Sequence, residues 1–107
     1  MRRVLFLPDV IDYFLELADV LYDKGYFGFE ENAIKYSCEL FEEIENELPR
    51  KHKKEAPKYF NKYGKGLYYA SFKNTTWYAF FNVFRSGGEV VYFVRYVSNN
   101  HVIGKYL

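Results

Sequence analysis

The clearest structural signal in this sequence is the period-two alternation of side chains along residues 67–97, which two short turns interrupt. Residues 67–73 predict one strand, Asn74-Thr75 a tight turn and residues 76–85 a second strand. Ser86-Gly87-Gly88 predicts the next turn and residues 89–97 a third strand, after which residues 98–100 break the pattern. We therefore expect a three-strand antiparallel meander. Alternation gives its middle strand two faces, one with Trp77, Ala79, Phe81 and Val83 and the other with Tyr78, Phe80, Asn82 and Phe84.

The first half of the chain has the periodicity of helices. Residues 4–7 form a short apolar run that predicts a strand, and Pro8 suits the first turn of a helix. Apolar side chains then recur every three or four residues until Lys24-Gly25, namely at Val10, Ile11, Phe14, Leu17, Ala18 and Leu21. A second helix follows the turn at residues 26–29 and ends at Pro49, with an apolar stripe of Ala33, Ser37, Leu40, Phe41, Ile44 and Leu48. The pattern predicts an α+β fold, in which an N-terminal strand and two helices pack on a mainly antiparallel sheet and leave its other face open.

The size and composition of the chain narrow the class of protein. At 107 residues and 12.9 kDa it suits one domain, residues 1–107. Its one cysteine excludes an internal disulfide framework, and no spacing of His, Cys or acidic residues resembles a metal site, so we expect no metal and no cofactor. No apolar run approaches the roughly 20 residues that span a bilayer, and residues 1–7 are too short for a signal peptide. We expect a soluble, cytoplasmic protein with no membrane partner.

The net charge of +1 conceals a strong separation of charge along the chain. Residues 1–48 carry 12 acidic and 4 basic side chains, whereas residues 49–107 carry 11 basic side chains against Glu55 and Glu89. This polarity predicts an acidic layer and a basic layer, and the basic layer is where a polyanion would bind. The alternative is a solvated acidic helix surface with no such partner.

The segment at residues 49–66 holds most of the positive charge and shows no periodicity, so we interpret it as a long basic loop. Its cations are Arg50, Lys51, Lys53, Lys54, Lys58, Lys62 and Lys65. Such a loop binds RNA by neutralising phosphates and releasing their counterions. The alternative is an exposed loop that lysines keep soluble.

The order and length of these segments resemble the RelE/ParE superfamily of bacterial toxin–antitoxin toxins. Residues 58–68, KYFNKYGKGLY, are similar to the family's basic loop running into a gly-leu-tyr strand start. Residues 77–83, WYAFFNV, occupy the place of its tyr-arg-x-x-tyr strand, and residues 6–10 resemble its first strand and helix. Residues 91–106, with Asn99-Asn100-His101 and Lys105-Tyr106, are similar to its last strand and its his/arg-then-tyr tail.

The resemblance implies a RelE-like fold and a toxin that a cognate antitoxin neutralises. RelE-like members cleave messenger RNA on the ribosome, and they need a base, cations and an acid around one phosphate but no metal. We therefore expect a ribosome-dependent endoribonuclease (an mRNA interferase) that inhibits translation, with ribosome and mRNA as partners. ParE-like members instead inhibit DNA gyrase without cleaving nucleic acid, and this alternative stays open. So does an inactive toxin-like protein that only binds an antitoxin.

The resemblance also selects candidate site residues. His101 and Tyr106 in the tail are the candidate acid–base pair, because the pKa of histidine lies near neutrality, and Arg95 is a candidate phosphate clamp. Each residue also has an alternative interpretation. His101 would have no function, Tyr106 would only pack against its neighbours, and Arg95 would pair with a helix carboxylate. Candidate RNA-binding residues are Lys51, Lys53, Lys54, Lys58, Lys62, Lys65, Lys73 and Arg85.

Aromatic side chains on the sheet supply a second candidate site. The candidate antitoxin or partner interface is Tyr69, Tyr78 and Phe80, because strand alternation keeps some of these rings out of the core. Tyr69, Ser71 and Tyr78 also stand where the family's nucleases carry strand Lys and Arg residues, and this departure keeps the non-enzymatic alternatives open.

Overall fold

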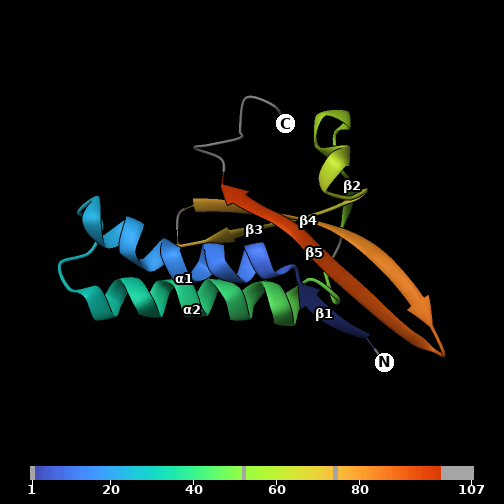
Figure 1. Ribbon diagram of the computed structural model, residues 1–107, viewed down its shortest axis with the longest axis horizontal. Coiled ribbons are helices and arrows are strands. Elements are labelled where there is room, and N and C mark those ends of the chain that lie inside the picture. Colours follow the sequence, from blue (N-terminus) through green and yellow to red (C-terminus); the bar gives the residue numbers. More distant parts are fainter. Residues whose placement is uncertain (1, 52, 74, 100–107) are drawn as a thin grey trace.

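The computed structural model describes residues 2–51, 53–73 and 75–99 and shows two helices packed along one side of a five-stranded sheet (Figure 1). Strand β1 (Arg2–Phe6) leads into helices α1 (Pro8–Asp23) and α2 (Glu30–Glu47). After α2 come β2 (Lys54–Glu55) and the 3₁₀ helix η1 (Lys58–Tyr63), then the meander of β3 (Gly66–Phe72), β4 (Thr75–Ser86) and β5 (Glu89–Asn99). The predicted α+β fold class is confirmed.

The sheet has the strand order β1-β5-β4-β3-β2. The pairs β2–β3, β3–β4 and β4–β5 are antiparallel. The N-terminal strand β1 lies beside β5 and pairs with it in parallel. The break expected at residues 98–100 is wrong for Ser98 and Asn99, which continue β5 opposite Tyr78 and Trp77. The pairing partner overrides the weak strand propensity of serine and asparagine at this position.

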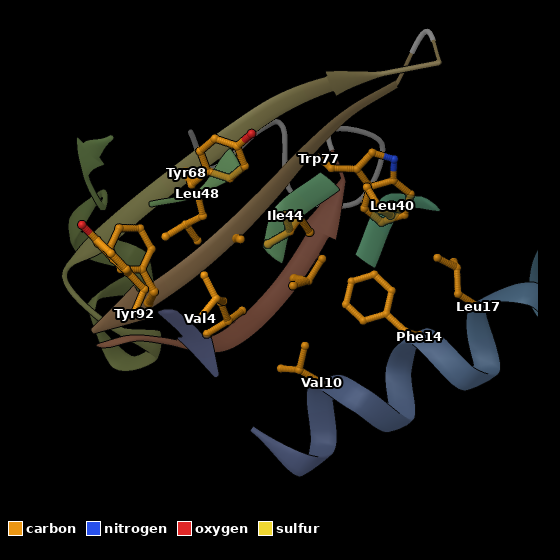
Figure 2. Packing of buried hydrophobic residues seen from close by; sticks show 14 of the residues in the cluster. Val4, Val10, Phe14, Leu17, Leu40, Ile44, Leu48, Tyr68, Trp77 and Tyr92 are labelled. Carbon is orange, nitrogen blue, oxygen red and sulfur yellow. The ribbon is translucent and has the colours of Figure 1, made fainter. Parts of the chain in front are cut away.

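The helices bury most of their apolar stripes against the sheet, as Figure 2 shows for Phe14 and Leu17 of α1 and for Leu40 and Ile44 of α2. Ile11, which the sequence pattern places in the first stripe, is 43% exposed. Proline at the first position of α1 starts that helix without losing a hydrogen bond. Two buried hydrogen bonds fix the layers. The Ser37 hydroxyl donates to the Phe14 carbonyl at 2.6 Å, and the Trp77 indole donates to the Tyr36 hydroxyl at 3.0 Å. The first joins α2 to α1, and the second joins α2 to β4.

A β-bulge interrupts the pairing of β4 with β5. Phe80 pairs with Tyr96 and Phe81 with Val94, so Arg95 is an extra residue in β5. A bulge of this kind turns two consecutive side chains toward the same face of the sheet. Arg95 and Tyr96 therefore both lie on the face away from the helices, while Val94 stays in the core on the helix side.

The sheet face away from the helices is partly covered, which corrects two sequence predictions. Residues 49–66 are not one irregular loop, because they contain β2 and η1, and η1 lies on this face (Figure 1). Phe60 of η1 stacks on Phe80 with ring centroids 4.7 Å apart, and Phe80 is 0% exposed. Phe80 is therefore part of a second apolar cluster. The prediction that Phe80 belongs to a partner interface is wrong, because η1 covers its ring. That cluster consists of Ala56, Phe60, Leu67 and Phe80, with Tyr63, Tyr78 and Tyr96 packed around it.

Glycine permits the close approach of η1 to β4. Gly64 ends η1 with a positive φ of 125°, and a Cβ atom there would lie 2.5 Å from the Phe81 carbonyl oxygen. The next amide, that of Lys65, donates to the side-chain oxygen of Asn82 at 3.2 Å. This short segment therefore anchors the end of η1 on the middle of β4. No helix within the described part of the chain is long and apolar enough to cross a membrane.

Candidate nucleic-acid-binding face

The sheet face that carries η1, here called the open face, has a pair of stacked tyrosines near its centre. Tyr63 of η1 lies over Tyr96 of β5 with ring centroids 4.2 Å apart and an interplanar angle of 18°. Both rings are only partly buried and rest against the second apolar cluster. Sequence reasoning missed this pair, although the three-residue spacing of Phe60 and Tyr63 after Pro57 is the signal of one face of a 3₁₀ turn.

A cation precedes each of the stacked tyrosines. The Lys62 ammonium lies 5.2 Å from the ring centroids of both Tyr59 and Tyr63, a cation–π geometry. Arg95 is exposed at the bulge beside Tyr96 and forms no ion pair with any residue that the structure describes. The carboxylate partner that would have given Arg95 a purely structural role is therefore absent from the described residues.

A second group of predicted residues gathers where β3 passes β2. The Lys54 ammonium lies 5.0 Å from the ring centroid of Tyr69, which is 42% exposed. Nearby, a cavity of about 480 Å³ brings Lys51, Tyr69 and Tyr78 together. Three of its other lining residues carry hydroxyl groups, namely Tyr68, Ser71 and Thr76, and the fourth is the carboxylate Glu43. A lysine among hydroxyl groups is suited to phosphate and sugar oxygens.

Two further predicted lysines lie on or beside η1. Lys58 begins the 3₁₀ helix and Lys65 follows Gly64, and both side chains are exposed. With Lys54, Lys62 and Arg95 they are five exposed cations on or beside β2, η1 and β5. Of these elements β2 and η1 are short, and the second apolar cluster holds η1 against the sheet.

Three predicted RNA-binding residues do not join this face. The Lys53 ammonium donates to the carbonyls of Leu48 at 2.9 Å and Lys51 at 2.7 Å, and burial together with Arg2 lowers its pKa. Lys73 is ion-paired with Glu39 at 2.7 Å on the helix side, and the hydrogen bond it donates lowers the pKa of Glu39. Arg85 pairs with Val90 near the tip of the long β4–β5 hairpin (Figure 1).

The remaining predicted catalytic residues, His101 and Tyr106, lie outside the described residues. Since His52 does too, the described residues contain no histidine. What they supply on the open face is positive charge, tyrosine rings and hydroxyl groups. This set can bind phosphates and stack on bases, and the predicted acid–base pair belongs to residues 100–107. No known protein family, no curated protein and no solved structure matches this chain.

Proposed function

We propose that this protein is a RelE/ParE-like toxin that binds RNA on its open face and cleaves messenger RNA in the cytoplasm. The observation that carries the proposal is the Tyr63–Tyr96 stack with Lys62 and Arg95 beside it, on the sheet face that the helices leave free. The element order also supports it, because a strand, two helices and a C-terminal antiparallel meander are what the family resemblance implies. A cognate antitoxin would neutralise such a toxin.

The chemistry of the open face suits single-stranded RNA better than a rigid duplex. Exposed lysines neutralise phosphates along the backbone and release counterions, which makes affinity depend on salt. Aromatic rings provide stacking surfaces for unpaired bases, each worth about 1–3 kcal/mol. The rings of Tyr69 and Tyr59 are 42% and 54% exposed, so unpaired bases of the same strand can reach them.

In the proposed reaction, the 2′-hydroxyl of one nucleotide loses its proton and attacks the adjacent phosphorus. The bond from phosphorus to the 5′-oxygen of the next nucleotide then breaks, and that oxygen takes up a proton. His101 and Tyr106 are the proposed acid–base residues, and Arg95 stabilises the charge that develops on the phosphate. The reaction requires no metal, because cations of the protein neutralise the pentacoordinate phosphate.

The test is translation of a defined messenger in a bacterial extract with purified protein, followed by mapping of new 5′ ends. We expect cuts that appear only while ribosomes translate. Arg95→Gln and His101→Ala should each lower cleavage at least tenfold. The matched control is Lys24→Gln, an exposed lysine at the end of α1 on the acidic side, and it should cleave like the wild type.

A messenger that stays intact, with protein synthesis undiminished, would overturn the nuclease proposal. The second candidate is then a ParE-like inhibitor of DNA gyrase that binds through Tyr69 and Tyr78, which line one cavity and are both accessible. It predicts that Tyr78→Ala abolishes inhibition of DNA supercoiling and that His101→Ala does not. If neither activity is present, the remaining alternative is an inactive toxin-like protein that binds an antitoxin.

A further inference from the structure

Apolar side chains are exposed along the outside of the helix pair, where no part of the described chain covers them. On α1 these are Ile11, Leu15 and Tyr22, which are 43%, 70% and 41% exposed. On α2 they are Ile34, 47% exposed, and the exposed Cys38. We call these five residues the helix seam.

The helix seam is continuous because its members share one side of each helix. At about 100° per residue, Ile11, Leu15 and Tyr22 fall within about 40° of one another on α1, next to the buried Ala18. On α2, Ile34 and Cys38 fall within about 60° of Phe41, whose ring packs on Phe14 of α1 with centroids 5.3 Å apart. The apolar flanks of the two helices therefore meet along the line where the helices touch.

Negative charge borders the helix seam on both sides. The two helices carry twelve carboxylates, five on α1 and seven on α2, against one base, Lys35. Asp12 and Asp19 lie next to the stripe on α1. On α2, Glu42 lies next to the stripe, and Glu45 continues the stripe two turns beyond Cys38. Among the described residues only Glu39 of these twelve forms an ion pair. So much like charge on one surface opposes folding through self-repulsion unless a cationic partner offsets it.

We propose that the helix seam binds a cationic amphipathic helix of a partner protein. The apolar face of that helix would lie on Ile11, Leu15 and Ile34, and its lysines or arginines would meet the carboxylates on either side. The distance from Ile11 to Tyr22 is three helical turns, about 16 Å, so a partner helix of about 12 residues or more covers it. This interface lies on the opposite side of the molecule from the open face and does not depend on RNA binding there.

A second copy of this chain does not offer such a helix. Both α-helices in the described residues are acidic, and Lys35 is the one basic side chain that they carry. Two helix seams facing each other would bring carboxylates together, which is unfavourable. RNA is excluded from this surface for the same electrostatic reason. A separate cationic helix is the occupant that satisfies both the apolar stripe and its acidic borders.

The experiment uses a synthetic 18-residue peptide with leucines at helical positions i, i+4, i+7 and i+11 and lysines elsewhere. The comparison peptide has the same composition in scrambled order. Binding to the full chain is measured by fluorescence anisotropy. We expect the patterned peptide to bind at least tenfold more tightly than the scrambled one. The double variant Leu15→Ser/Ile34→Ser should remove this preference, and thermal unfolding verifies that it folds.

Val83→Ser provides the matched control, because Val83 is also exposed, at 42%, but lies on β4 away from the helices. It should bind the patterned peptide like the wild type. Equal affinity for both peptides would overturn the proposal, since charge alone would then explain binding. An equal loss in Val83→Ser would also overturn it. So would a wild-type dimer that Leu15→Ser dissociates, since the seam would then be covered by a second copy.

Discussion

The two faces of the sheet bury apolar side chains to very different extents. On the helix side, α1 and α2 close a cluster of fifteen buried residues among those that the structure describes. On the open face, the six-residue η1 closes a cluster of four, and the three tyrosines around it stay partly exposed. Both clusters share β4, because Trp77, Ala79 and Phe81 point to one side and Tyr78 and Phe80 to the other.

This difference in burial gives the two faces of the sheet different roles. Long amphipathic helices exclude water from the helix side, which supplies most of the hydrophobic stabilisation. The small cover on the open face leaves rings and cations accessible, so that face can bind a ligand without unfolding. Charge follows the same division, because the two helices carry twelve carboxylates while Lys62 lies beside the tyrosine stack and Lys54 beside Tyr69 on the open face.

The largest expected effect comes from breaking the helix-side core with Phe14→Ala. Phe14 contacts the rings of Phe6, Tyr13 and Phe41 and is almost fully buried. Removing it should lower the free energy of unfolding by about 4 kcal/mol, through lost transfer energy and a cavity. Urea unfolding followed by circular dichroism measures the change. A domain of this size has only about 5–15 kcal/mol in total.

The neighbouring residue provides the control for that variant. Leu15→Ala also removes apolar volume from the same helix, but its side chain is 70% exposed, so the free energy of unfolding should change by less than about 0.5 kcal/mol. Equal losses in the two variants would show that Leu15 is covered in solution, and the assignment of α1's buried face would then be wrong.

A smaller and more local effect is expected from Phe60→Ala on the open face. Phe60 is nearly fully buried, but the chain around it lies at the surface and can rearrange, so we expect a loss of about 2 kcal/mol. Amide hydrogen exchange measures where the loss occurs. The amides of Ala56 and Gly64, which donate to Lys65 and Asn61, should lose protection. The amide of Leu48 at the end of α2 should keep it.

Tyr59→Ala provides the comparison within η1, because the Tyr59 ring is 54% exposed. It should leave both sets of amides protected while weakening RNA binding. Loss of protection in α2 as well as η1 after Phe60→Ala would mean that the two clusters unfold as one unit, which contradicts the division between the faces.

The helices and the meander were predictable because each is encoded by local periodicity. The stripe from Val10 to Leu21 and the alternation around Trp77 require only the spacing of apolar residues and the turns between them. The helix-side core followed from these patterns, and the structure places Phe14, Leu40 and Trp77 in it. Exposure of Tyr69 also agrees with the alternation.

The open face was not predictable in the same way, because tertiary contacts create it. The spacing of Phe60 and Tyr63 suits a 3₁₀ turn, but the place of η1 depends on Phe60 meeting Phe80, 20 residues further along the chain. The bulge at Arg95 leaves no signal in the alternation of β5, yet it brings Tyr96 over to Tyr63. Lysines that look equivalent in sequence also separate, since Lys53 binds carbonyls while Lys62 stays beside the stack.

The smallest effect at neutral pH is expected from Tyr68→Phe, although this variant should alter the response to alkali. Burial, with smaller contributions from Glu43 and Glu47, raises the pKa of Tyr68 to about 12. Burial likewise raises the pKa of Tyr13 to about 12, with smaller contributions from Tyr96 and Tyr36. Both side chains pack on the helix side, so their response to alkali reports on that core.

The direction of the effect follows from linkage. Because the pKa is higher in the folded protein than the usual 10 of the unfolded chain, these tyrosines leave stability unchanged below pH 10. Between about pH 10 and 12 the unfolded chain loses the protons first, so the free energy of unfolding falls. Tyr68→Phe should remove part of this fall, and Tyr68→Phe/Tyr13→Phe should remove more, as measured by urea midpoints at pH 7, 9.5 and 11. A double variant that loses stability as steeply as the wild type would place the alkali-sensitive groups outside the helix-side core.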